Sequence, residues 1–139
     1  MRKSTKTGRL PAIVLNEEDH ERLTGLATAA LDRNPDVAEE LLKELERARV
    51  VHNRRLPAKA IRMGSTVTYS SDGTSRTVTL VYPGEADIAA GRISIMTPIG
   101  AALIGLSEAQ SITWMARDGR RHELEVLTVT HDEPAVAEG

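Results

Sequence analysis

Hydrophobic periodicity changes once along this chain, from helical spacing before residue 52 to two-residue alternation after residue 64. In the first part, apolar residues recur at the spacing that gives a helix one buried face. In the second part, segments such as 65–70 and 76–81 alternate apolar and polar side chains, as strands with one buried face do. The chain is therefore predicted to be α+β, with helices first and an antiparallel sheet after them.

Two short helices are predicted to form an antiparallel hairpin over residues 16–51. Asn16 is a good N-cap for a first helix that runs to about Leu31. Asn34 then caps a second helix to about Val51, and Pro35 opens it, because proline fits the first helical turn and disfavours helix at the residue before it. Helices of ~15 residues reach only roughly 22 Å, so the hairpin is short.

The remaining segments complete a layout with one sheet domain, residues 65–130. Residues 1–15 are interpreted as a flexible arm and lead-in, the basic stretch 52–64 as a linker, and 131–139 as a polar tail. Thr97–Pro98 repeats the N-cap and proline signal and predicts one short helix that stops at Gly105. Strands are predicted at 65–70, 76–81, 92–96, 111–116 and 122–130.

Composition excludes several kinds of site. The 139 residues include no Cys, no Phe, one Trp and two Tyr, so thiolate metal sites and an aromatic base-stacking platform are excluded or disfavoured. The four histidines are scattered, and no catalytic or phosphate-binding glycine motif is present, so no enzyme activity, catalytic residue, metal or cofactor is predicted. The net charge of −2 does not favour nucleic acid or a membrane surface as a partner. With no apolar run of ~20 residues, the chain is predicted to be soluble and cytoplasmic.

Four segments make the second half recognisable: LVYP (80–83), SIMTPIGAALIGL (94–106), Ile112–Thr113–Trp114 and LEVL (124–127). In this order they resemble the C-terminal domain of the bacterial Gre transcript-cleavage factors. The similarity is closer to the small Gre relatives known as regulators of nucleoside diphosphate kinase (Rnk). The resemblance implies an FKBP-like fold for the second domain. It also implies docking at the rim of the RNA polymerase secondary channel, with the hairpin pointing into that channel.

The Gre resemblance places polymerase contacts on the loop and helix start around a Ser-Pro pair. The corresponding positions here are Met96, Thr97, Pro98, Ile99 and Gly100. Some Gre factors carry an acid before the Ser-Pro pair, and Met96 stands at that place, which implies that a salt bridge to the rim is missing. From the residues alone, Thr97 and Pro98 have a simpler role, which is to start the helix.

The hairpin tip is predicted to comprise Asp32, Asn34, Asp36, Glu39 and Glu40. Gre factors stimulate cleavage with acids at the end of a long coiled coil, which help hold catalytic Mg²⁺, and Asp36 and Glu39 have the corresponding spacing. The alternative for Asp36 is stabilisation of the helix dipole. A Gre arm is about twice the length expected here, so the tip falls short by roughly 20 Å.

The sequence therefore predicts a non-enzymatic, monomeric transcription modulator. It binds RNA polymerase, competes with Gre-type factors without efficient cleavage, and does not read nucleic-acid sequence. An alternative is a true cleavage stimulator that uses Asp36 and Glu39. A remote alternative is a peptidyl-prolyl isomerase, which the low aromatic content disfavours.

Overall fold

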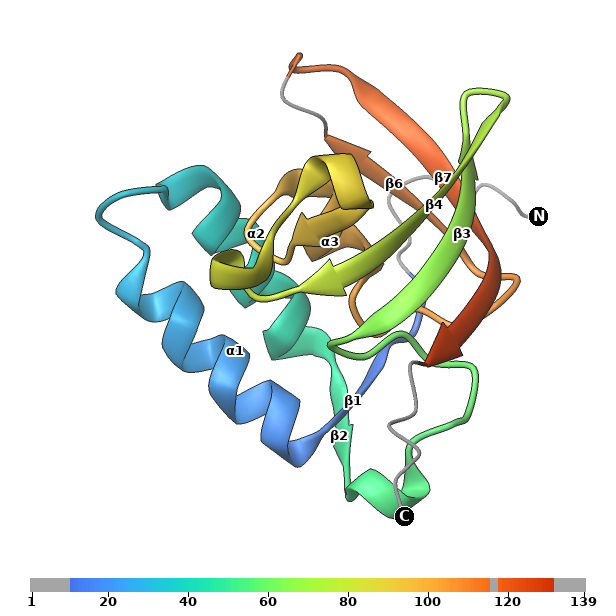
Figure 1. Ribbon diagram of the computed structural model, residues 1–139. Helices are drawn as coiled ribbons and strands as arrows, with labels where there is room; N and C mark the ends of the chain where they lie inside the picture. The colour runs from blue at the N-terminus through green and yellow to red at the C-terminus, as the bar shows by residue number, and fades with distance from the viewer. Residues whose placement is uncertain (1–10, 116–117, 132–139) are drawn as a thin grey trace, which may run out of the picture.

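The computed structural model describes residues 11–115 and 118–131. The first ten residues of the predicted arm, the predicted strand end at Ala116 and the tail from residue 132 lie outside the described residues. Two helices come first and a sheet follows, as the α+β prediction requires (Figure 1). The helices and strands are, in chain order, β1 (Val14–Asn16), α1 (Glu17–Ala29), α2 (Pro35–Arg47), β2 (Arg49–Val51), β3 (Ser65–Ser71), β4 (Thr74–Val81), β5 (Arg92–Ser94), α3 (Pro98–Leu103), β6 (Ser111–Met115) and β7 (Arg121–His131).

Helix α1 begins where its local sequence predicts. The Asn16 side chain accepts a hydrogen bond from the Asp19 N–H at 2.7 Å, and three acidic residues occupy the first turn. These carboxylates lie at the positive end of the helix dipole, which stabilises the start of the helix. The helix ends at Ala29, slightly before the predicted Leu31.

Helix α2 begins at Pro35 as predicted, but two details of the prediction are wrong. Asn34 occupies the N-cap position without a capping hydrogen bond from its side chain. The helix also ends at Arg47 rather than near Val51, because Arg49–Val51 form strand β2. This strand pairs in parallel with β1, and the Arg49 N–H donates to the Ile13 carbonyl at 3.0 Å. Its partner, β1, lies before α1 in the sequence, so no local pattern around Arg49 indicates the strand.

The main sheet has five strands in the order β5-β4-β3-β7-β6. The β3–β4, β3–β7 and β6–β7 pairs are antiparallel. The prediction of an antiparallel sheet is wrong at one edge, because β5 pairs in parallel with β4. The connection between these two strands contains two short 3-10 turns, Pro83–Glu85 and Ile88–Ala90, and it brings the chain back to run in the same direction.

The two faces of this sheet differ in chemistry. One face carries buried apolar side chains from β3, β4 and β7, such as Val67, Leu80 and Val126. The other face carries threonines in cross-strand pairs. The hydroxyls of Thr66 and Thr79 lie 2.9 Å apart, and a second such pair joins β3 to β4 one layer along. Cross-strand threonine pairs suit a solvated sheet face, so the helices cover the apolar face only.

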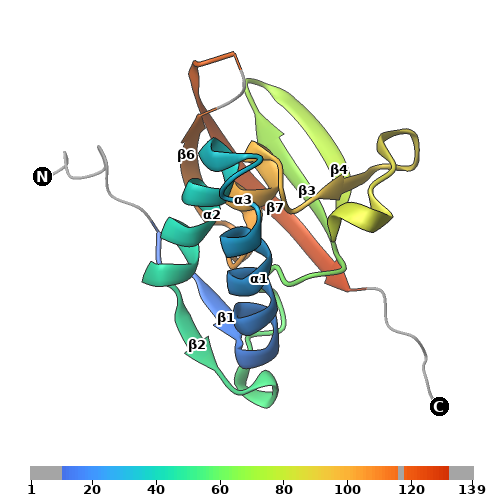
Figure 2. The same ribbon diagram turned by 90° about the vertical axis from the view of Figure 1, so that its left-hand side faces the viewer.

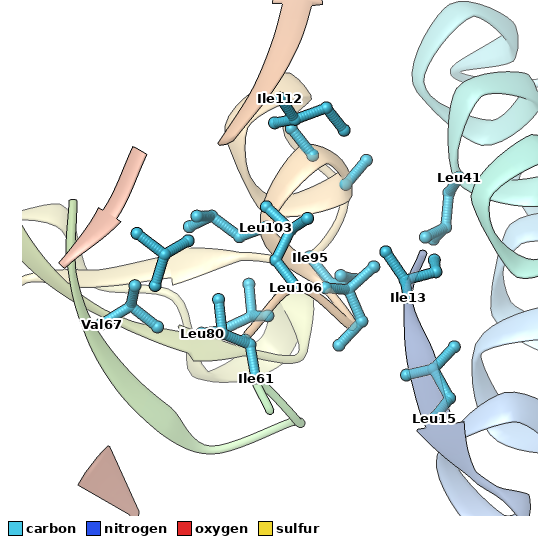
Figure 3. Close-up of a cluster of buried hydrophobic side chains, with 14 of the residues drawn as sticks. Ile13, Leu15, Leu41, Ile61, Val67, Leu80, Ile95, Leu103, Leu106 and Ile112 are labelled. Atoms are coloured by element: carbon cyan, nitrogen blue, oxygen red, sulfur yellow. The ribbon is translucent and has the colours of Figure 1, made fainter. Parts of the chain in front are cut away.

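One buried cluster joins the helices to the sheet. Ile13, Leu15 and Leu41 from the helical part pack in the same cluster as Leu80 and Leu103 from the sheet part (Figure 3). Helix α2 lies beside α3, as two views of the molecule agree (Figures 1 and 2). The helices therefore share a core with the sheet, instead of standing apart from it.

The segment predicted as a linker, 52–64, contributes to this core. The Ile61 side chain is fully buried, its N–H donates to the Leu106 carbonyl at 2.7 Å, and its carbonyl accepts from the Gly105 N–H at 3.0 Å. The Val14 N–H donates in turn to the Gly105 carbonyl at 3.1 Å. Gly105 thus connects β1 to this segment. The division of the chain into a hairpin, a linker and a sheet domain stays a prediction.

Candidate functional site

The turn that leads from β5 into α3 is held by local hydrogen bonds. The Thr97 hydroxyl accepts from the Gly100 N–H at 3.1 Å and donates to the Ser94 carbonyl at 2.7 Å. The Met96 N–H donates to the Ser94 hydroxyl at 2.9 Å. The predicted N-cap at Thr97, followed by Pro98 at the start of the helix, is confirmed. Because these bonds close within the turn, its shape is set before any partner binds.

Gly100 is the tightest position in this turn. A Cβ atom added there would lie 2.4 Å from the Ser94 carbonyl oxygen and 3.0 Å from the Ile95 Cα. Both of these are backbone atoms, so a larger residue must displace the chain itself. Gly100 is also buried. Gly100 therefore determines the shape of the turn and contributes little accessible surface to it.

The residues predicted to contact a partner lie together on this turn. Met96, Thr97, Pro98 and Ile99 are half-buried. Met96 and Ile99 pack against the core with part of their side chains. The turn therefore offers a small apolar contact surface whose inner side is already supported by the fold. That these residues bind a partner stays a prediction.

The loop between α1 and α2 and the first two turns of α2 carry the residues predicted at the tip. Asp32, Asp36, Glu39 and Glu40 are exposed, and Asn34 is half-buried. In the described part of the chain, no group of three His, Cys, Asp or Glu side chains converges on a position that would hold a metal ion. The residues predicted at the tip therefore form an exposed acidic surface.

The two helices that support this tip are short. Each has 13 residues, which corresponds to about 20 Å at the rise of an α-helix. The packing of α2 beside α3 keeps part of that length against the body of the protein (Figure 2). Only the remainder extends toward the tip.

Comparison with known proteins accounts for both halves of this arrangement. Residues 56–131 match the C-terminal part of the transcription elongation factors GreA/GreB, and residues 11–51 match the Rnk N-terminus. The chain belongs to the GreA/GreB family. Within that family it falls in the branch with an Rnk N-terminus, as its motifs predict.

Individual relatives of the GreA/GreB family agree with this assignment. The "Regulator of nucleoside diphosphate kinase" of Escherichia coli (strain K12) is 34% identical over 130 residues, which cover 92% of this chain and 96% of that protein. The transcription elongation factor GreA of Rhodospirillum rubrum is 36% identical over 130 residues, covering 86% of this chain and 82% of that protein. A solved GreA/GreB elongation factor from Nitrosomonas europaea superposes with a TM-score of 0.69 at 31% identity, over 86% of this chain and 99% of that chain.

The structure contains a polar groove that the sequence did not predict. It has a volume of about 550 Å³ and lies between the start of α1, the segment before β3 and the end of β4. Its lining includes Asp19, whose carboxylate accepts from the Met63 N–H at 3.2 Å, and burial raises the pKa of this carboxyl. The Arg22 guanidinium lies over the Tyr82 ring, 5.4 Å from its centre. The lining comes from segments that are far apart in the sequence, around Asp19, Met63 and Tyr82, so no local signal indicates the groove.

His122 joins two turns at the far end of the sheet. Its Nδ1 lies 2.6 Å from an Asp72 carboxylate oxygen in the β3–β4 turn, and its Nε2 lies 3.4 Å from Asp118 in the β6–β7 turn. The hydrogen bond to Asp72, aided by that to Asp118, raises the pKa of His122. The imidazole ring also lies 5.5 Å from the Trp114 ring. His122 therefore links the β3–β4 turn to the β6–β7 turn.

No helix of the described residues is long and apolar enough to cross a membrane.

Proposed function

We propose that this protein is a transcription modulator that binds RNA polymerase at the rim of the secondary channel. It docks there through its C-terminal domain, for which we propose an FKBP-like fold, and its paired helices form a hairpin that enters the channel. It acts as a monomer in the cytoplasm, without enzymatic activity of its own and without reading nucleic-acid sequence. Occupying this site, it competes with Gre-type factors without efficiently triggering transcript cleavage.

The turn from Met96 to Gly100 is the proposed docking surface. Membership in the GreA/GreB family supports polymerase as the partner. The closed hydrogen-bond network around Thr97 supports the turn as the contact, because a rigid apolar edge loses little conformational entropy when it binds. Pro98 and Ile99 supply the apolar area of this contact.

The length of the helices is the observation that supports the proposed lack of transcript cleavage. Each has 13 residues, or about 20 Å, and part of α2 is packed against α3. The Gre resemblance implies an arm about twice as long for carboxylates to reach the catalytic metal. A carboxylate coordinates Mg²⁺ only at about 2 Å. The proposed tip therefore ends too far away to take part in the chemistry, whatever the spacing of its acids.

Competition for core RNA polymerase tests the docking proposal. A labelled Gre-type factor bound to core polymerase is titrated with this protein, and the bound label is followed by fluorescence anisotropy. We expect full displacement of the label at saturation. Binding of both proteins at once, without displacement, would contradict a shared site.

A cleavage-stimulating elongation factor is the second candidate function. It is favoured by one observation, the exposure of Asp36 and Glu39 one helical turn apart. Backtracked polymerase complexes distinguish it. The proposed modulator leaves the transcript intact, whereas a true stimulator shortens it and loses that activity in the Asp36→Ala, Glu39→Ala double variant. A peptidyl-prolyl isomerase is checked by a proline-peptide assay, in which we expect no activity because the chain has no Phe and few other aromatic residues.

A further inference from the structure

The connection between β4 and β5 displays an unusually exposed apolar side chain. Ile88 is 86% exposed, whereas the other exposed large apolar side chains among the described residues, Val50 and Leu127, are 41% and 40% exposed. Its neighbours Ala86, Ala89 and Ala90 are also exposed. We call residues 86–90 the Ile88 loop. It exposes four apolar side chains within five positions, which is more than a single scattered surface residue.

Hydrogen bonds hold the Ile88 loop in one shape. Asp87 and Arg92 exchange two backbone hydrogen bonds, each of 2.9 Å, which close the loop at its base. Within it, the Gly91 N–H donates to the Ile88 carbonyl at 3.0 Å, and Gly91 adopts a left-handed conformation with φ of 78°. The Gly91 carbonyl then accepts from the Thr79 N–H at 2.7 Å, which anchors the loop to β4. Ile88 is thus exposed on a rigid support.

The Ile88 loop lies next to the proposed docking turn. Strand β5 (Arg92–Ser94) is the edge strand of the sheet, and it joins the loop at one end to the turn at the other. Three residues of strand span about 10 Å. One partner in a standard interface contributes about 800 Å², which is enough to cover both features. Figure 2 shows the connection from β4 to β5 projecting beyond the end of β4, where a partner can approach it.

We propose that Ile88 is a second apolar anchor through which this chain docks on RNA polymerase, beside the turn from Met96 to Gly100. This inference rests on the proposed function. The continuity of the loop with the docking turn along one sheet edge favours polymerase as the occupant over a second copy of this chain. Ile88 requires an apolar pocket on that surface, and the exposed carboxylates of Glu85 and Asp87, which both precede Ile88 in the chain, favour basic groups beside the pocket.

The test is the affinity of the full chain for core RNA polymerase, measured by fluorescence anisotropy with a matched set of variants. The Ile88→Ser variant is expected to bind about tenfold more weakly or worse, because burial of an isoleucine side chain is lost. The Ile88→Leu variant is expected to keep the affinity. Leu127→Ser, on strand β7, is the control, and it is expected to leave the affinity unchanged. Because the Ile88 side chain is almost fully exposed, the thermal midpoint of the Ile88→Ser variant is expected to match that of the wild type.

The possible outcomes separate this inference from the proposed function. If the wild type binds polymerase and Ile88→Ser binds equally well, the anchor is refuted and the proposed function stands. If Ile88→Ser converts a wild-type dimer to a monomer in sedimentation without changing polymerase affinity, the loop serves a second copy and the inference is overturned. If the wild type fails to bind polymerase, both proposals fall.

Discussion

Replacing Gly100 with alanine tests whether close packing fixes the turn before α3. The added Cβ meets the Ser94 carbonyl oxygen at 2.4 Å and the Ile95 Cα at 3.0 Å. Overpacking of a well-packed site costs about 1–3 kcal/mol, and contact with backbone atoms places this case near the upper end. The higher helix propensity of alanine offsets about 1 kcal/mol of this cost, since Gly100 lies inside a helix. We therefore expect Gly100→Ala to lower the free energy of unfolding by about 2 kcal/mol.

The same substitution at Gly25 is the matched control. Gly25 lies inside α1, is exposed, and has no atom within 4 Å of the position that a Cβ would take. Only the helix propensity changes there, so Gly25→Ala is expected to raise the free energy of unfolding by about 1 kcal/mol. The two Gly→Ala variants should thus shift stability in opposite directions.

Thermal and urea unfolding followed by circular dichroism measure both shifts. At about 3 °C per kcal/mol for a chain of this length, Gly100→Ala is expected to melt roughly 6 °C lower than the wild type, and Gly25→Ala roughly 3 °C higher. A Gly100→Ala variant as stable as the wild type would refute the argument. The turn would then have room to shift, and its shape would not be fixed before binding.

Two further predictions concern the core and the far end of the sheet. Leu41→Ala is expected to cost about 3 kcal/mol, because this α2 side chain is fully buried in the cluster that joins helices and sheet. Urea unfolding of the Leu41→Ala variant, followed by helix circular dichroism and by Trp114 fluorescence, should show the same single transition with both probes. A fluorescence transition at the same urea concentration as in the wild type would contradict a shared core. For His122, the raised pKa means that its contacts stabilise the fold fully below the ordinary imidazole pKa and less as pH rises through the raised value. The difference in thermal midpoint between wild type and His122→Gln is therefore expected to be largest near pH ~5 and to shrink by pH ~9, whereas a difference that does not vary with pH would refute the charged contact.

Much of the fold was predictable where the signal was local. Asn16 begins α1, and Thr97 with Pro98 begins α3, because a capping side chain and a proline act within one helical turn. The strand positions β3, β4 and β7 followed from two-residue alternation, since one face of the sheet is buried and the other carries threonine. Predictions failed where the partner was distant. The end of α2 was placed too late because Arg49–Val51 pair with a strand that lies before α1.

The candidate site was predictable only in part. The motif around Thr97 and Pro98 identified the family and placed five residues on one turn, but it did not reveal that Gly100 is buried against backbone. The exposed Ile88 was not singled out, since apolar residues occur in loops of many chains and only the coordinates give the exposed fraction.

The sequence by itself determined the kind and order of helices α1 to α3 and of the strands of the main sheet, the helix starts and the family, but not the short strands β1 and β2. Caps, prolines, periodicity and a specific motif act over a few adjacent residues. Only the tertiary structure decided how those elements meet: the parallel pairings β1–β2 and β4–β5, the core common to helices and sheet, and the groove around Asp19. Each of these depends on contacts between residues far apart in the chain. Their free energy comes from burial and hydrogen bonding in three dimensions, which no local pattern encodes.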